Sequence, residues 1–256
     1  MTQARAAYET KVVKLALEKS RDKYGTYVLH VNPGLLSTQR VERAMQEGVE
    51  LNIASSPLWN TATGDTAPLS IIPIPIARGL LGYRQCIVRK EDLPKFAQVK
   101  SLEDLQQLTA GLGTNWTELD VFRASGLKWQ GGKDITQLHS MLARSRFDYL
   151  PLGIVEAESS LARSAHKNEL AIAPDLIIFY PLPVFIQVSV SRPLLAERLE
   201  HGLRRAIADG SLDTLFSQHF AEQIKKLSSP SLRVIRLENP NVPPFIRDFG
   251  PVLIEQ

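Results

Sequence analysis

The sequence predicts an α/β fold made of two lobes, with mixed sheets flanked by helices. Segments with helical spacing alternate with short strand-like segments over residues 7–56, which is typical of a sheet covered by helices. Two long extended runs stand apart from this alternation, at residues 73–90 and 177–190. The block between these runs has about 90 residues, which is the size of an independent domain.

The first lobe is expected to begin with a helix and to continue as a strand–helix–strand unit. Apolar residues recur at helical spacing over residues 7–22, and the strand-like TYVLHV follows at 26–31. Ser37 can cap a second helix that runs to Gln46, and a second strand is expected at residues 49–56. This order of elements favours a parallel sheet.

The block between the two runs carries the same alternation. Ser101 is followed three residues later by Asp104, as in a capping box, and Asp134 can cap a later helix. Gly79 and Gly82 lie within the first run, where they allow backbone angles that other residues disfavour. The other elements that we expect are strand 109–113, helix 114–124, strand 147–153, helix 154–164 and strand 170–173, followed by a mostly helical chain after residue 190.

The two extended runs are expected to divide the chain. They would be crossover strands that form a hinge, so that the lobes can open and close on a ligand. The alternative is one continuous sheet in which residues 73–90 form a bent hairpin. The expected division is residues 1–83 and 184–256 for lobe 1 and 84–183 for lobe 2, with hinge strands at 73–90 and 177–190.

Composition argues against several classes of protein. Of the 256 residues, 44% are hydrophobic and 22% are charged, as in an ordinary globular protein. The net charge of +3 is small and the basic residues are scattered, so nucleic acid is not an expected partner. No apolar run approaches the roughly 20 residues of a membrane span. The single cysteine, Cys86, lies in an apolar strand, where it is either a small buried hydrophobe or a reactive thiol.

Motifs of catalysis, cofactor binding and metal binding are broken in this sequence, so we expect no enzyme activity, no cofactor and no metal. GLGTNW at 111–116 has Trp116 where a dinucleotide-binding fingerprint needs its last glycine. GLKWQGGKD at 126–134 departs from a phosphate loop in its spacing. No serine lies in a G-x-S-x-G elbow, and the five histidines do not have metal-ligand spacing.

The order of several motifs is similar to that of a known superfamily. In chain order they are YGTYVL, GVELNIAS, IPIARGLLGYRQCIV, SLEDLQQLTAGLGTNW, MLARSRFDYLPLGIVEAE and YPLPVFIQVS. Over residues 8–222 the chain resembles the type-2 periplasmic solute-binding proteins, in the branch near the polar-amino-acid receptors of ABC transporters. In that superfamily a strand and a ligand-contacting loop precede the first helix, so we expect this element to be missing or to lie upstream.

The resemblance implies a ligand contact after the strand at 109–113. The superfamily uses a Gly-Thr pair there for the carboxylate of its ligand, and the pair here is Gly113-Thr114. Asn115 and Trp116 follow, at the expected start of a helix, where free backbone N–H groups attract anions. The alternative is an ordinary helix cap.

The resemblance also implies contacts from the loop before the first run. The candidates there are Ser55, Trp59 and Asn60, although a loop tryptophan can equally pack on its own lobe. The superfamily carries an arginine in this loop that clamps the carboxylate of the ligand, whereas residues 44–77 contain no Lys or Arg. Arg78 or Arg84 on the first run could substitute for this arginine.

The remaining candidates lie in the second lobe. Arg146 precedes the strand at 147–153 and Tyr149 lies near its start; a solvated helix end would explain the arginine equally well. The resemblance implies an acidic group just beyond this strand to hold an ammonium group, and Glu156 is the candidate. Tyr180 lies beside the second run.

We therefore predict a solute-binding protein that captures a small polar ligand, anionic or amino-acid-like, between two lobes for an ABC-type transporter or a sensor. We expect a monomer with a permease or sensor partner. The first 20 residues contain no signal peptide, so a periplasmic location is expected only if an export signal has been removed. Two alternatives are open: a dehydratase-like cleft enzyme of the same fold with Glu156 as general acid, and a ligand-free sensory or interaction module.

Overall fold

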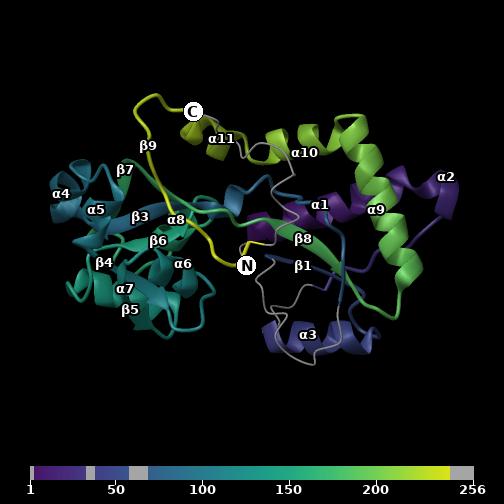
Figure 1. Cartoon of the computed structure of the whole chain (residues 1–256), viewed down its shortest axis with the longest axis horizontal. Helices are drawn as coiled ribbons and strands as arrows, with labels where there is room; N and C mark the ends of the chain where they lie inside the picture. The colour runs from purple at the N-terminus through teal and green to yellow at the C-terminus, as the bar shows by residue number, and fades with distance from the viewer. Residues whose placement is uncertain (1–2, 33–37, 58–68, 243–256) are drawn as a thin grey trace. The chain divides into compact units, whose positions relative to one another are not determined.

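The computed structural model describes residues 3–32, 38–57 and 69–242 (Figure 1). The chain divides into two compact units. The described residues of unit 1 are 3–32, 38–57, 69–78 and 183–224, and those of unit 2 are 79–182 and 225–242. In this described part, no helix combines the length and the apolar character needed to cross a membrane.

Unit 1 is built on a three-stranded antiparallel sheet in which β8 lies between β1 and β2. Its strands are β1 (Ile53–Pro57), β2 (Ser70–Ile71) and β8 (Val184–Val188). Its helices are α1 (Gln3–Lys19), α2 (Arg21–Tyr24), α3 (Thr38–Glu47), α9 (Pro193–Ala208) and α10 (Ser211–His219), and the unit boundary at residues 224–225 falls within α11 (Ala221–Leu227).

The predicted strand at residues 26–31 and the parallel sheet in the first lobe are wrong. Residues 25–32 have no regular secondary structure, and Val28 and Val31 are 81% and 57% exposed. β1 pairs instead with β8 in the antiparallel sense, with Ile53 opposite Val188. A segment with strand-forming side chains becomes a strand only where a neighbouring strand takes its backbone hydrogen bonds.

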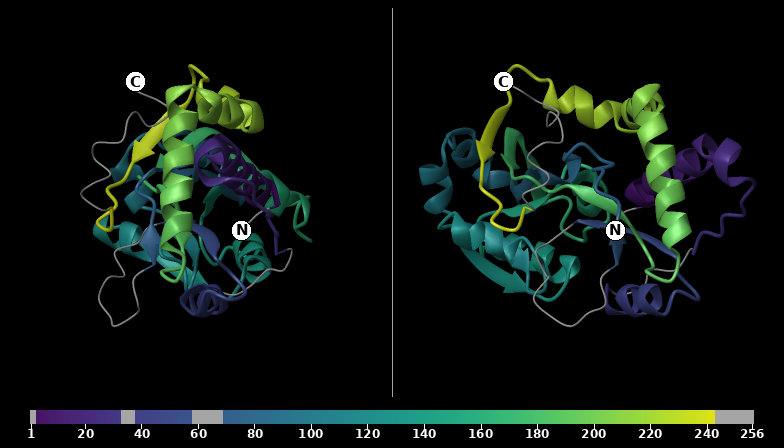
Figure 2. Two further views of the ribbon diagram at one scale, coloured as in Figure 1. Left: turned by 90° about the vertical axis from the view of Figure 1, so that its right-hand side faces the viewer. Right: turned by 45° about the vertical axis from the view of Figure 1, so that its right-hand side comes forward.

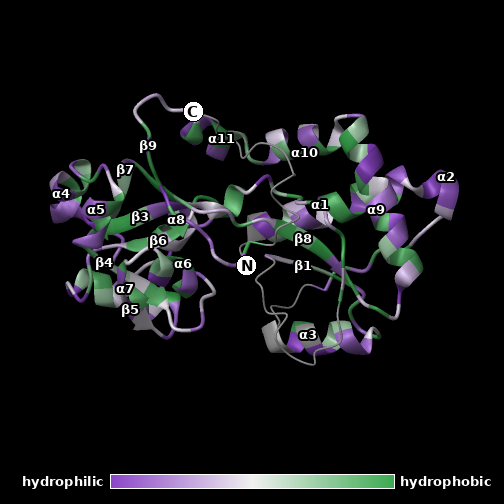
Figure 3. Cartoon of the chain, viewed as in Figure 1, coloured by the Kyte–Doolittle hydropathy of each residue, from purple (hydrophilic) through white to green (hydrophobic). Residues whose placement is uncertain are grey.

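The core of unit 1 forms where α9 packs against α1, which both views of Figure 2 show. The helices approach closely at Gly202, where an added Cβ would lie 1.9 Å from the backbone oxygen of Ala16. Tyr8 of α1 is fully buried and its hydroxyl donates to the carbonyl oxygen of Ile76 at 2.5 Å. Figure 3 shows the corresponding hydropathy, with β8 strongly hydrophobic and α9 hydrophobic only in part.

Unit 2 contains a four-stranded mixed sheet with the order β6–β3–β7–β9 and a parallel pair, β4–β5. β3 is antiparallel to both of its neighbours, whereas β7 and β9 are parallel. The strands are β3 (Tyr83–Arg89), β4 (Thr109–Gly113), β5 (Lys128–Gly132), β6 (Leu150–Gly153), β7 (Leu170–Phe179) and β9 (Arg233–Arg236). The helices are α4 (Leu93–Ala97), α5 (Leu102–Gln106), α6 (Leu119–Ala124), α7 (Ile135–Ala143) and α8 (Ala157–Ala162), with short 3-10 turns η1 (Leu80–Gly82) and η2 (Lys90–Asp92).

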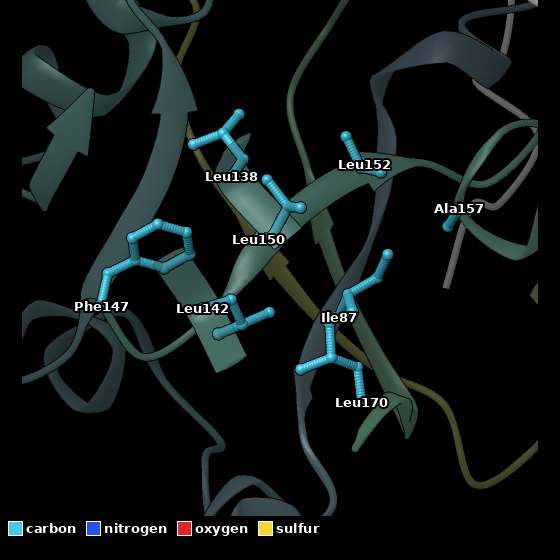
Figure 4. Close-up of a cluster of buried hydrophobic side chains, with 8 residues drawn as sticks. All are labelled: Ile87, Leu138, Leu142, Phe147, Leu150, Leu152, Ala157 and Leu170. Atoms are coloured by element: carbon cyan, nitrogen blue, oxygen red, sulfur yellow. The ribbon is translucent and has the colours of Figure 1, made fainter. Parts of the chain in front are cut away.

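The core of unit 2 gathers side chains from β3, β6, β7, α7 and α8 (Figure 4). Its members are Ile87, Leu138, Leu142, Phe147, Leu150, Leu152, Ala157 and Leu170, each at most 4% exposed. Cys86 on β3 is also fully buried, which confirms the interpretation as a small buried hydrophobe. Cys86 and Ile87 are adjacent and point to opposite faces of the strand, so both faces of β3 are covered.

Each extended run contributes to both units. The first run supplies Ile74 and Ile76 to the core of unit 1 and then β3 to unit 2. Gly79 has a left-handed φ of 70°. Gly82 is required for a different reason, because an added Cβ would lie 2.0 Å from the backbone oxygen of Tyr180. The alternative of one continuous sheet is wrong, since β2 and β8 pair in one sheet whereas β3 and β7 pair in another.

Three further details differ from the sequence expectations. Residues 225–242 were assigned to the first lobe, but they belong to unit 2, where β9 pairs with β7. The helix expected from Thr114 begins only at Leu119. β5 was not predicted, because its sequence KWQGG has two glycines, which disfavour strands in the absence of a pairing partner.

Candidate functional site

The candidate site lies in unit 2 around Arg84, a buried arginine on β3. The antiparallel register places Arg84 opposite Gly153, the last residue of β6, and Tyr83 opposite Phe179, the last residue of β7. The segments that follow β6 and β7 are therefore brought beside the start of β3. They carry Glu156 and Tyr180, so three of the residues predicted from sequence lie together.

Arg84 is only 6% exposed and is held by two carboxylates. Its Nη2 donates to Oε1 of Glu118, and its Nη1 lies 3.4 Å from Oε1 of Glu156. The guanidinium carbon is 5.2 Å from the centre of the Tyr180 ring, which gives a cation–π contact. The Nε of Arg84 is buried and has no hydrogen-bond partner among the described residues. We call Arg84, Glu118, Glu156 and Tyr180 the Arg84 cluster.

Burial and charge act in opposite directions on the Arg84 guanidinium. Burial alone would lower its pKa, but the tyrosine hydroxyl and the two carboxylates outweigh burial, and the net pKa is raised. Burial likewise raises the pKa of the Tyr180 hydroxyl. The cluster therefore holds one positive and two negative charges, with a neutral phenol, and its net charge is −1.

Glu156 is the member of the cluster that faces solvent most. Its side chain is 36% exposed, against 16% for Glu118 and 7% for Arg84. Its Oε1 accepts from the backbone N–H of Gly153 at 3.2 Å as well as from Arg84. Its Oε2 has no partner within the described residues and is free to accept from a ligand. In the dehydratase alternative Glu156 would be a general acid; in the structure this carboxylate is half-buried and pairs with Arg84.

The predicted anion site at Thr114 has a different geometry from the one expected. The N–H of Thr114 donates to the carbonyl of Gly132 and that of Trp116 to the carbonyl of Gly113, both at 3.0 Å. The Trp116 ring covers Gly113 and packs against the core of unit 2. Two of the three expected N–H donors thus have backbone acceptors, while the exposed side chain of Asn115 stays a predicted contact.

Two other predicted residues of unit 2 make no contact with the Arg84 cluster among the contacts that the structure describes. Tyr149 is fully buried and packs edge-on against Phe96 with ring centres 5.9 Å apart, and its hydroxyl has no partner among the residues that the structure describes. Arg146 is exposed at the end of a turn after α7. Neither of them shares an element with Arg84.

In unit 1, the Ser55 hydroxyl donates to Oε2 of the buried Glu9 at 2.5 Å. Arg78 forms an ion pair with Asp213 within unit 1, so this candidate substitute for the missing arginine already has a carboxylate partner. Trp59 and Asn60 lie outside the described residues.

Glu118 is the member of the cluster that sequence reasoning missed. It lies at the N-terminal end of α6, where an acidic residue is expected simply because it stabilises the helix dipole. The sequence around Arg84 did not indicate that Glu118 would pair with it, because Arg84, Glu118 and Glu156 come from segments that are distant along the chain. Within the described ranges, no group of three or more His, Cys, Asp or Glu side chains could hold a metal ion.

The chain is similar to several solved structures. No protein-family profile and no curated protein matches the sequence. An ancestral arginine-binding protein bound to arginine is 19% identical, with a TM-score of 0.50 over 82% of this chain and 87% of that chain. An amino acid ABC transporter substrate-binding protein from Streptococcus pneumoniae bound to L-arginine is 13% identical, with a TM-score of 0.51 over 82% of each chain.

The GluR0 ligand-binding core from Nostoc punctiforme in complex with L-glutamate is 14% identical to the chain, with a TM-score of 0.51 over 83% of this chain and 90% of that chain. At these identities the similarity concerns the fold alone. The predicted fold class is confirmed: the chain has the two-lobed α/β fold of the type-2 periplasmic solute-binding proteins.

Proposed function

We propose that this chain is a solute-binding protein that captures a small polar solute for an ABC-type permease or a sensor, in the periplasm. The observation that carries the proposal is the Arg84 cluster, in which a buried arginine holds two carboxylates and Oε2 of Glu156 has no partner in the described part of the chain. Closure of the two lobes on the ligand at a hinge, predicted from the two extended runs, belongs to the same proposal.

The charge of the cluster favours a solute that carries an ammonium or guanidinium group. Arg84 is already paired with Glu118 and Glu156, so it is not available to clamp the carboxylate of a ligand. The free Oε2 of Glu156 accepts hydrogen bonds and attracts cations. Two of the similar structures hold arginine, which is a cationic amino acid. We therefore expect basic amino acids and small amines to bind better than glutamate or simple carboxylates.

Isothermal titration calorimetry on the whole chain tests the proposal. The panel contains L-arginine, L-glutamine, L-glutamate, small amines and small carboxylates. Loss of a charged hydrogen bond is worth about 1.5–3 kcal/mol, so Glu156→Gln should weaken binding of a cationic ligand roughly 10- to 100-fold. Glu158→Gln is the matched control, since Glu158 is an exposed carboxylate on α8 that pairs with Lys226 and lies outside the cluster.

Two results would contradict the proposal. If no compound of the panel binds saturably, the chain fits the ligand-free sensory or interaction module instead. If a ligand binds but Glu156→Gln and Glu158→Gln affect it equally, solute binding stands and the Arg84 cluster is not its site.

A further inference from the structure

Unit 2 contains a cavity of about 270 Å³ that none of the residues of the Arg84 cluster lines. Side chains from β3, β7, the end of α11 and the segment that follows α11 surround the cavity, together with Ile154 after β6. Most of the lining is apolar, and Ile172, Ile177, Leu227 and Leu232 contribute to it. The cavity belongs to unit 2 alone.

A bulge in β7 lies along this cavity. Gln85 of β3 pairs with Ile177, whereas Ile87, two residues later, pairs with Ile172. Residues 173–176 of β7 therefore have only Cys86 of β3 opposite them. Asp175 in this bulge has a left-handed φ of 53°, a conformation that aspartate tolerates better than most residues. Such bulges often occur beside binding sites, where they redirect side chains.

Two hydrogen-bond acceptors at the cavity have no partner among the described residues. Oε1 of Gln85 is buried and has no hydrogen-bond partner in the described part of the chain. Asp175 is exposed, and its carboxylate has no hydrogen-bond or ion-pair partner among these same residues. The one cation of the lining, Lys226, already forms an ion pair with Glu158. A buried acceptor without a donor is destabilising, so a ligand that supplies the donor is favoured.

We propose that this cavity binds a small amphipathic amine. The ammonium group donates to Asp175 and to Oε1 of Gln85, and the apolar body contacts the isoleucines and leucines of the lining. An apolar cavity of about 150 Å³ holds benzene, so the larger volume here accommodates one aromatic ring with a short aminoalkyl chain. This site is separate from the proposed solute site and needs no residue of the Arg84 cluster.

Titration of the whole chain with phenethylamine, followed by NMR, tests the proposal. The neutral analogue 2-phenylethanol and the anion 3-phenylpropionate are matched probes of similar shape. We expect saturable shifts of the Gln85 side-chain amide and the Leu232 backbone amide. An exposed ion pair is weak, so the amine should bind only about threefold more tightly than the alcohol, and the carboxylate more weakly than both.

Asp175→Asn is the decisive variant, because asparagine keeps the size of the side chain and the tolerance for a left-handed backbone. It should abolish the preference for the amine over the alcohol and leave the affinity of the alcohol unchanged. Leu232→Trp should fill the cavity and weaken all three probes at least tenfold. Ala173→Leu is a second filling variant, for use if the first does not fold.

Several results would overturn the proposal. They are the absence of saturation by phenethylamine, shifts confined to the Arg84 cluster, and an unchanged preference for the amine in Asp175→Asn. Glu156→Gln separates the two proposals, since it should weaken solute binding but leave phenethylamine binding at the cavity intact. Amine binding at the cavity can therefore be refuted while the proposed function stands, and the proposed function can be refuted while amine binding at the cavity stands.

Discussion

Replacing Arg84 by methionine should destabilise unit 2 far more than a surface arginine substitution would. Methionine keeps most of the apolar stem of the arginine but removes the charge. Glu118, whose side chain is 16% exposed, would then lie largely buried without a cation. Removal of one partner from a buried ion pair leaves an uncompensated charge, and that is the main cost.

The magnitude follows from the exposure of the two carboxylates. Breaking a fully buried pair costs about 3–5 kcal/mol. The Glu156 partner is 36% exposed, so its pairing contributes at most about 1 kcal/mol. Because Glu118 keeps some contact with solvent, we expect a loss of about 3 kcal/mol in the free energy of opening unit 2, which is roughly 150-fold in the opening equilibrium.

Cys86 provides a readout specific to unit 2. It is the only cysteine of the chain, it lies on β3 two residues from Arg84, and it is fully buried. Burial raises the pKa of its thiol to about 12, so the native thiol is both inaccessible and protonated. A thiol reagent therefore reacts when unit 2 opens, and Arg84→Met should accelerate labelling by the same factor of about 150 when reclosing is faster than labelling.

The matched control is Arg78→Met. Arg78 also pairs with a carboxylate, but the side chains of Arg78 and Asp213 are 41% and 57% exposed and lie in unit 1. Its loss should cost at most about 1 kcal/mol and leave Cys86 labelling unchanged. The double variant Arg84→Met/Glu118→Gln should label more slowly than Arg84→Met alone. If Arg84→Met labels within threefold of the wild type at an unchanged urea midpoint, the burial argument for the cluster is refuted.

Three further predictions concern other parts of the chain. Burial, and secondarily the charge of a neighbouring histidine, lower the pKa of His139 below 6.5, so protonation favours the unfolded state. The free energy of unfolding should therefore fall as the pH drops below 6.5. His139→Gln should make the free energy of unfolding less dependent on pH, which urea titrations at about pH 5.5 and 7.5 would measure. Gly202→Ala would place a Cβ 1.9 Å from the backbone oxygen of Ala16, and overpacking of this kind should lower the free energy of unfolding by about 1–3 kcal/mol, measurable by urea denaturation; an unchanged midpoint would contradict the close helix contact. Tyr8→Phe removes the 2.5 Å hydrogen bond to Ile76 and should cost about 1–3 kcal/mol in the same assay, because the carbonyl is left buried without a donor.

Local patterns in the sequence determined the elements that depend on neighbouring residues. The capping box at Ser101 and the cap at Asp134 are both present, because a cap needs only a side chain and an amide three residues away. The burial of Cys86 followed from its apolar flanks. The presence of two lobes followed from the two extended runs, and the fold class from the order of motifs along the chain.

Pairing between distant segments was decided only by the tertiary structure. TYVLHV has the side chains of a strand, yet it has no pairing partner in the described chain, whereas KWQGG becomes β5 because β4 pairs with it in parallel. The same limit applied to the candidate site. The sequence indicated Arg84, Glu156 and Tyr180 separately, but Glu118 joined them only through the register of β3 and the position of α6. The chemistry of each side chain follows directly from the sequence, whereas the pairing of distant strands decides which partner a buried charge receives.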